Sequence, residues 1–126
     1  WGLYASHITD YMRRWILKTP WGMLRVHRWL REDRDPDPHD HPFDFTSLII
    51  RGGYVERLRT PGGSVVEAFT EGAIIRRKAH DAHTVIAITP GTVTLVITAP
   101  KRGSWGYHTP MGWVPWRTYH RVPVKP

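Results

Sequence analysis

Two short histidine clusters are the part of this sequence best suited to chemistry. His39 and His41 flank one aspartate, and His80 and His83 follow further along the chain with two residues between them. Because strand side chains alternate between two faces, His39 and His41 can project from the same face of an extended segment. An imidazole from a distant strand would complete a cage of nitrogen and oxygen ligands around a divalent metal. The two clusters are therefore the candidate active site.

Other polar residues near the clusters have candidate roles of their own. Asp44 is the first carboxylate after His41 and is a candidate metal ligand beside the histidines. Asp40, on a strand, would face away from its neighbouring histidines, and we interpret it as structural. His80 is a candidate catalytic residue that lines the pocket. His108, within an aromatic stretch, is a candidate acid or base that closes over the mouth of the pocket.

The amino-acid composition narrows the kind of site. The chain has 126 residues and no cysteine, which excludes disulfides, thiolate metal ligands and a cysteine nucleophile. Any metal must then be held by imidazole and carboxylate, a donor set that suits Fe(II), Mn, Ni or Zn. On iron, such a site with open coordination positions is typical of oxygenases.

The excess of basic over acidic residues indicates which partners the chain could bind. The net charge is +7, which favours an acidic partner. The basic residues are dispersed in pairs and triplets, a pattern typical of ordinary solubility, and nucleic acid is therefore less favoured than a small-molecule substrate. Four residues would bind an anionic substrate if they line a barrel, namely Arg25, His27, Arg51 and Arg76.

The sequence also carries signals about location and assembly. It has no run of eighteen apolar residues and no charged segment followed by an apolar one, as a signal peptide has. We therefore expect a soluble, cytoplasmic protein with no membrane contact, folded as one domain over residues 1–126. Strand edges and aromatic residues near both ends of the chain favour a homodimer.

One helix is predicted, over residues 6–19. Ser6 suits its N-cap, and apolar residues recur at helical spacing on one face. Basic residues fall near its C-terminal end, where the helix dipole favours them. The sequence 19–22, which contains a proline, is expected to end the helix.

From residue 23 onward the pattern is that of short strands separated by turns. Residues 23–31 alternate as a half-buried strand does. The runs 85–89 and 92–98, joined by a Pro-Gly turn, are predicted to pair as a hairpin. Strands at this spacing indicate a closed or double-sheet all-β domain, with a barrel over 23–100 and an aromatic segment over 104–126. Further β-prone runs cover 45–50, 54–58, 64–69 and 72–77.

This pattern resembles the cupin family of β-barrels. The first cupin signature contains His-x-His, then a glutamate and later a glycine; His39 and His41 supply the histidines and Gly52 lies near the expected glycine. The second signature is a glycine, five residues, Pro-x-Gly, two residues and a histidine. Gly72 and the residues after it follow that spacing and align the motif's histidine with His83. The layout is most similar to small phage- and bacterium-associated members, and that likeness implies no particular reaction.

Departures from the cupin signatures leave the ligand set open. No glutamate stands three or four residues after His41, and no glycine precedes His39 at the expected offset. Lys78 and His80 replace the proline and glycine of the second signature. Either Asp44 is a ligand, or the metal is held by three histidines, as in cupin thiol dioxygenases.

The resemblance implies a double-stranded β-helix, or jelly-roll barrel, here with one N-terminal helix. It also implies three alternative functions. The first is a mononuclear Fe(II)-type oxygenase acting on a small anionic substrate, with Zn, Ni or Mn as the other metals. The second is a metal-independent or Zn-bound isomerase or epimerase, in which a histidine is the general base. The third is a non-catalytic module that binds a ligand or nucleic acid, and the fold alone does not select among them.

Overall fold

The computed structural model describes residues 2–5, 12–32, 37–101 and 103–121. Over these residues the chain forms short β-strands and one short helix near its C-terminal end. Most strands are rich in β-branched or aromatic residues, which pack well on a pleated surface. The elements are β1 (Gly2–Ala5), β2 (Met12–Thr19), β3 (Gly22–Trp29), β4 (Phe45–Arg51), β5 (Gly53–Thr60), β6 (Gly63–Thr70), β7 (Ile74–Arg77), β8 (His83–Ile88), β9 (Val93–Thr98), β10 (Gly106–Thr109), β11 (Gly112–Pro115) and α1 (Trp116–Arg121).

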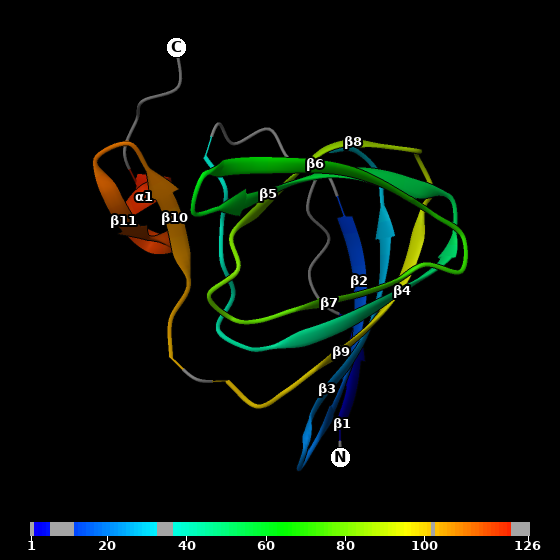
Figure 1. Cartoon of the computed structure of the whole chain (residues 1–126). Helices are drawn as coiled ribbons and strands as arrows, with labels where there is room; N and C mark the ends of the chain where they lie inside the picture. The colour runs from blue at the N-terminus through cyan, green and yellow to red at the C-terminus, as the bar shows by residue number, and fades with distance from the viewer. Residues whose placement is uncertain (1, 6–11, 33–36, 102, 122–126) are drawn as a thin grey trace.

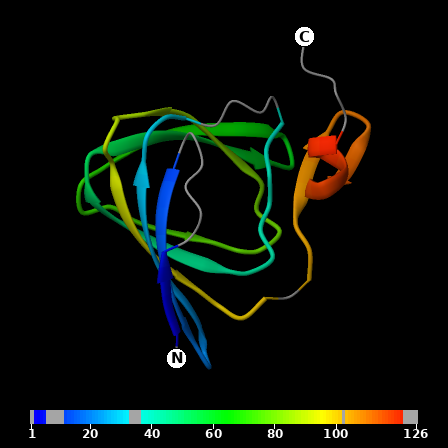
Figure 2. The same cartoon turned by 180° about the vertical axis from the view of Figure 1, so that it is seen from behind.

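Two antiparallel sheets and a separate hairpin make up the fold. Six strands form one sheet in the order β1-β2-β3-β9-β4-β7, and three form a second in the order β6-β5-β8. Figure 1 and Figure 2 show both sheets curving round a common interior, with the β10–β11 hairpin and α1 to one side. This arrangement confirms the predicted all-β jelly-roll architecture.

The hydrophobic core lies between the two sheets. Ile49 and Ile75 come from β4 and β7 of the larger sheet, and Tyr54 and Val85 come from β5 and β8 of the smaller one. All four side chains are buried in one cluster. Burial of apolar surface from both sheets is what holds the sheets together.

The turn from β4 into β5 depends on Gly52. Its φ angle of 83° lies in the left-handed region that glycine adopts at little cost. A Cβ atom there would also lie 2.3 Å from the hydroxyl oxygen of Thr92, which in turn accepts a hydrogen bond from Gly53 N at 3.0 Å. The chain can therefore pass from one sheet to the other at this point only with glycine.

The predicted N-terminal helix is wrong where the structure tests it, because residues 12–19 form β2. The other residues of that prediction, 6–11, lie outside the described part of the chain. Along β2, Met12 and Ile16 are buried, and Arg14 between them lines the interior with Met12. A cation on the inward face hid the period-two pattern, and apolar residues on both faces gave an apparent helical period.

The predicted hairpin over 85–89 and 92–98 is also wrong. Strand β8 pairs with β5, whereas β9 pairs with β3 and β4. The Pro-Gly turn therefore carries the chain from the smaller sheet to the larger one. Local β propensity predicted both strands, but their partners are distant in sequence and left no local signal.

Among the described residues, no helix has the length and apolar character needed to cross a membrane.

Candidate metal centre

The segment that carries His39 lies between β8 and β10. His39 N donates to His83 O at 3.0 Å, and His83 N donates back to His39 O at 2.9 Å. A second backbone bridge joins His39 to Tyr107 of β10. Residues that face each other in an antiparallel pair project their side chains to the same side. The imidazoles of His39 and His83 are accordingly adjacent, with ring centroids 4.8 Å apart.

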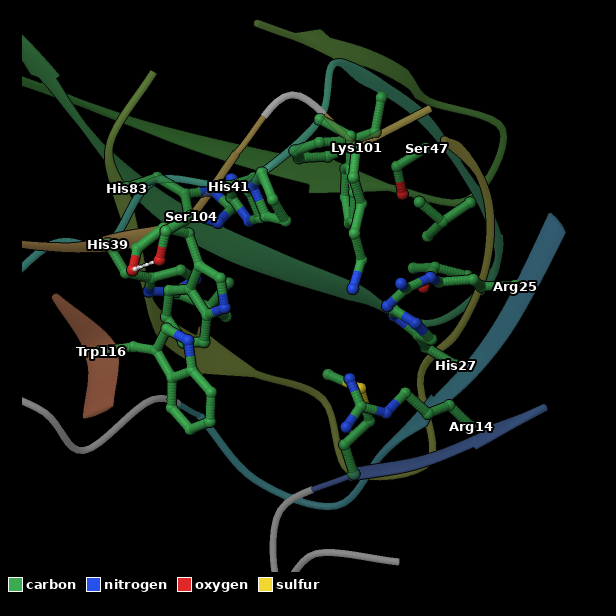
Figure 3. Close-up of a pocket in the computed structure, with 18 of the residues that line it drawn as sticks. Arg14, Arg25, His27, His39, His41, Ser47, His83, Lys101, Ser104 and Trp116 are labelled. Carbon is green, nitrogen blue, oxygen red and sulfur yellow. Dashed lines mark hydrogen bonds between the residues drawn. The ribbon is translucent and has the colours of Figure 1, made fainter. Parts of the chain in front are cut away.

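His41 completes a group of three imidazoles. Its backbone N donates to Ala79 O at 3.0 Å, and its ring centroid lies 5.1 Å from that of His39 and 4.9 Å from that of His83. One ring nitrogen from each histidine lies within 4.8 Å of the others. Figure 3 shows the three side chains together at one end of a cavity.

A buried carboxylate orients one of these imidazoles from behind. Glu56 on β5 is 1% exposed, and its Oε2 lies 2.6 Å from His83 Nδ1. Arg77 donates to the same carboxylate. Burial acts to raise the pKa of Glu56, but the hydrogen bonds and positive charges of His83 and Arg77 outweigh it and hold the pKa below its usual range. An ionised carboxylate only accepts, so Nδ1 of His83 carries the proton and Nε2 is the nitrogen that can bind a metal.

The chemistry of the donor set fits a divalent transition metal. The Nδ1 atom of His41 is buried and has no hydrogen-bond partner in the described structure. Burial, followed by the nearby charges of His83, His39 and Arg25, lowers the pKa of His41 well below its usual value, so its imidazole is neutral. A neutral imidazole with an unused nitrogen is the form that binds metals. His39, His41 and His83 therefore fit a three-nitrogen metal site.

The three histidines open onto a cavity of about 700 Å³ inside the barrel. Figure 3 shows Arg14, Arg25 and His27 at the end away from the histidines, and Lys101 reaching into the space between. Among the described residues that line the cavity there is no Asp or Glu. The cavity is therefore positively charged and suited to an anion. Its wall also includes aromatic side chains, namely Trp29, Phe43, Phe45, Tyr54, Trp105 and Trp116.

His27 lies among these cations as a neutral side chain. Burial, and then the charges of Arg25 and Arg14, lower the pKa of His27 to about 3. Its Nε2 atom is buried without a hydrogen-bond partner. The guanidinium of Arg25 lies 4.9 Å from the centre of the Phe43 ring, a cation–π contact that helps to hold it at the cavity wall.

Several predicted site residues lie elsewhere. Asp44 Oδ1 accepts a hydrogen bond from Ala79 N at 2.7 Å, and Asp44 is not part of the three-histidine group. The side chain of His80 is 85% exposed. Arg51 and Arg76 are exposed and do not line the cavity. Of the four predicted substrate-binding residues, the structure brings only Arg25 and His27 to the cavity.

His108 lies on the far side of the ligand segment. Its Nε2 is 3.0 Å from Asp40 Oδ2, and that oxygen also accepts from Trp113 Nε1 at 2.9 Å. The other oxygen of Asp40 accepts from Gly106 N at 2.7 Å. Because Asp40 lies between His39 and His41, it points to the β10–β11 hairpin while they point into the cavity. The carboxylate therefore fastens the hairpin to the segment that carries the two histidines.

Sequence reasoning missed the orienting carboxylate, the cavity cations Arg14, Lys101 and Arg117, and the aromatic wall near the mouth. Glu56 stands far from the position of the glutamate in the first cupin signature, so the motif did not point to it. Arg14 was assigned to a helix, and Lys101 to no element. Alternation of Met12, Arg14 and Ile16 within β2 was the signal that would have placed Arg14 inside the barrel.

Comparisons with known proteins agree with this architecture. No family model matches the sequence, and no curated protein matches it. Solved structures do match. KdgF from Halomonas sp. is 19% identical, with a TM-score of 0.60 over 78% of this chain and 87% of that one. A variant of oxalate decarboxylase from Bacillus subtilis is 13% identical, with a TM-score of 0.65 over 81% of this chain but only 28% of that one.

A third similar structure is that of hydroxypropylphosphonic acid epoxidase from S. wedmorenis. It is 15% identical, with a TM-score of 0.60 over 78% of this chain and 55% of that one. A related structure, of HppE, contains Fe(II). All of these proteins have the cupin fold. The chain therefore also has the cupin fold, as the resemblance led us to expect.

Proposed function

We propose that this protein is a metal-dependent enzyme of cupin fold, most closely of the Fe(II) oxygenase type, acting on a small anionic substrate. The observation that carries the proposal is the convergence of three imidazole nitrogens within 4.8 Å of one another at the wall of a cavity whose described lining residues include no acid. His39, His41 and His83 would hold the metal. Iron is the first choice because an all-nitrogen site with open positions suits it, and Zn, Ni and Mn remain alternatives.

The chain's own residues would prepare the site before a substrate enters. Glu56 keeps the proton on His83 Nδ1, so that Nε2 keeps its lone pair for the metal. The backbone pairing of His39 with His83 fixes the spacing of two ligands. Phe43 and Phe45 pack against the His41 ring, with centroids 6.2 and 4.7 Å away, and keep water from its far side. A bound divalent iron would supply Lewis acidity and one-electron chemistry with dioxygen.

The anionic substrate follows from the charges at the other end of the cavity. Arg14, Arg25 and Lys101 line it with no acidic neighbour among the described lining residues. A substrate held there would be oriented with its reactive portion toward the three histidines. Orientation of this kind can lower a reaction barrier substantially, because the reacting groups no longer have to find each other.

Metal-free acid–base catalysis, the second function expected from sequence, has less support. The cavity histidine outside the metal group is His27, and its pKa of about 3 makes it a weak base at neutral pH. His108 is held by Asp40 at 3.0 Å and does not line the cavity. His27 therefore lacks the pKa, and His108 lacks the position, that a general base in this cavity needs.

Metal content measured by mass spectrometry, on protein purified without chelator or nickel affinity, tests the proposal. We expect close to one metal ion per chain, lost in His41→Ala and in His83→Ala. His80→Ala is the matched control, since His80 is exposed, and it should keep the metal. If the metal in the wild-type protein is iron, the next experiment is a screen for dioxygen consumption with small anionic substrates. Absence of metal after anaerobic Fe(II) loading, or loss of metal in the His80 variant as well, would contradict the proposal.

A further inference from the structure

The end of the cavity away from the three histidines has the composition of a second binding site. Arg14 extends from β2, and Arg25 and His27 extend from β3, so that the two paired strands present their cations side by side. Figure 3 shows these three side chains converging, with the amine of Lys101 directed toward them from the opposite side. The buried residue Ser47 also lines this end and adds a hydroxyl group.

His27 indicates that a ligand completes this site. His27 lines the cavity, and its Nε2 atom is buried and has no hydrogen-bond partner in the described structure. Buried polar atoms in folded proteins almost always have a partner, so an atom without one calls for an explanation. Protonation would not satisfy it, because the flanking Arg14 and Arg25 disfavour a further positive charge. A ligand oxygen beside Nε2 would supply the missing partner.

We propose that Arg14, Arg25, His27 and Lys101 form a subsite for a dianionic oxyanion group of the substrate, of the phosphate or phosphonate type. Three cations, with no acid among the described residues that line the cavity, exceed what one carboxylate needs. They match a group that carries close to two negative charges at neutral pH. Arginine side chains suit such a group because their planar donors bind two oxygens at once. A neutral imidazole and the Ser47 hydroxyl would occupy further oxygens.

This inference rests on the proposed function in one respect: the subsite would hold one end of the substrate while the other end of the substrate faces the metal. Binding of the oxyanion itself needs no metal. The test can therefore be made on metal-free protein and again on protein as purified, and the two proposals can fail separately.

Isothermal titration of the protein with inorganic phosphate, methylphosphonate and acetate is the experiment. We expect phosphate and methylphosphonate to bind at least tenfold more tightly than acetate in the presence and absence of chelator. Arg14→Gln should weaken phosphate binding at least tenfold. Arg13→Gln is the matched control, because Arg13 is the neighbouring cation on β2 and is exposed, and it should bind as the wild type does.

Two further variants keep the test sound if Arg14→Gln folds poorly. Lys101 is exposed in a loop, so Lys101→Gln should leave the thermal midpoint unchanged and still weaken phosphate several-fold. His83→Ala should lose metal but keep phosphate binding. Equal affinity for acetate and phosphate, equal losses in the Arg13 and Arg14 variants, or loss of phosphate binding in His83→Ala would each overturn the inference. Metal binding without phosphate binding would overturn it and leave the proposed function standing.

Discussion

The two ends of the cavity are built in different ways. At the histidine end, backbone pairing places His39, Glu56 orients His83, and Asp40 fastens the segment that carries His39 and His41. At the cationic end, the Nε2 atom of His27 lies buried with no partner in the described structure. The histidine end therefore has supports behind two of its imidazoles, which suits the proposed metal site, whereas we propose that a bound oxyanion completes the cationic end.

Glu56 gives the largest expected effect on the histidine end. Glu56→Ala would leave Arg77 without its buried carboxylate, and we expect the free energy of unfolding to fall by about 3–5 kcal/mol. In protein that still folds, metal affinity should fall roughly 10–100-fold because His83 loses its orienting partner. Urea unfolding and metal titration measure both effects. Glu67→Ala, the exposed residue opposite Glu56 on β6, should change neither; equal effects at both positions would contradict the role of Glu56.

At the cationic end of the cavity, His27 should make the free energy of unfolding depend on pH. The pKa of His27 is about 3 in the folded chain and about 6.5 when unfolded, so below pH 6.5 the unfolded state binds the extra proton. The contribution of His27 to the free energy of unfolding is therefore fully present above pH 6.5. It is lost as the pH falls toward 3, by at most about 1.4 kcal/mol per pH unit. Denaturant unfolding of metal-free wild type and His27→Gln at several pH values measures this. The difference between them should shrink as the pH falls, and a constant difference would contradict the assignment.

Asp40 should give the smallest of these effects. Asp40→Asn keeps the shape but replaces one oxygen that accepts from Trp113 with a donor, so the hairpin loosens. We expect metal affinity to fall roughly tenfold, as for other residues that orient ligands from behind. Asp81→Asn is the control, since Asp81 also lies near a ligand but accepts only from Lys78 N among the bonds described. A metal titration in which both variants match the wild type would show that the hairpin does not position His39 and His41.

The sequence allowed the all-β fold and the three histidines to be predicted because both leave local signals. His39 and His41 stand one residue apart, and the spacing from Gly72 identified His83. Asp44 was attractive for the same local reason, yet its side chain caps Ala79 N. Glu56 and Arg14 were missed because their roles depend on strand pairing between distant residues, β5 with β8 and β2 with β3. Helical spacing misled over 12–19 for a different reason, because Arg14 on the inward face hid the period-two pattern of a strand.

The most direct test of the three-histidine metal site is a crystal structure of the protein loaded anaerobically with Fe(II), with an anomalous difference map collected at the iron edge. We expect one strong peak about 2.1 Å from a ring nitrogen of each of His39, His41 and His83. We also expect Nδ1 of His83 to remain bonded to Glu56. A peak bound by Asp44 or His80 instead, or no ordered iron in the cavity, would contradict it.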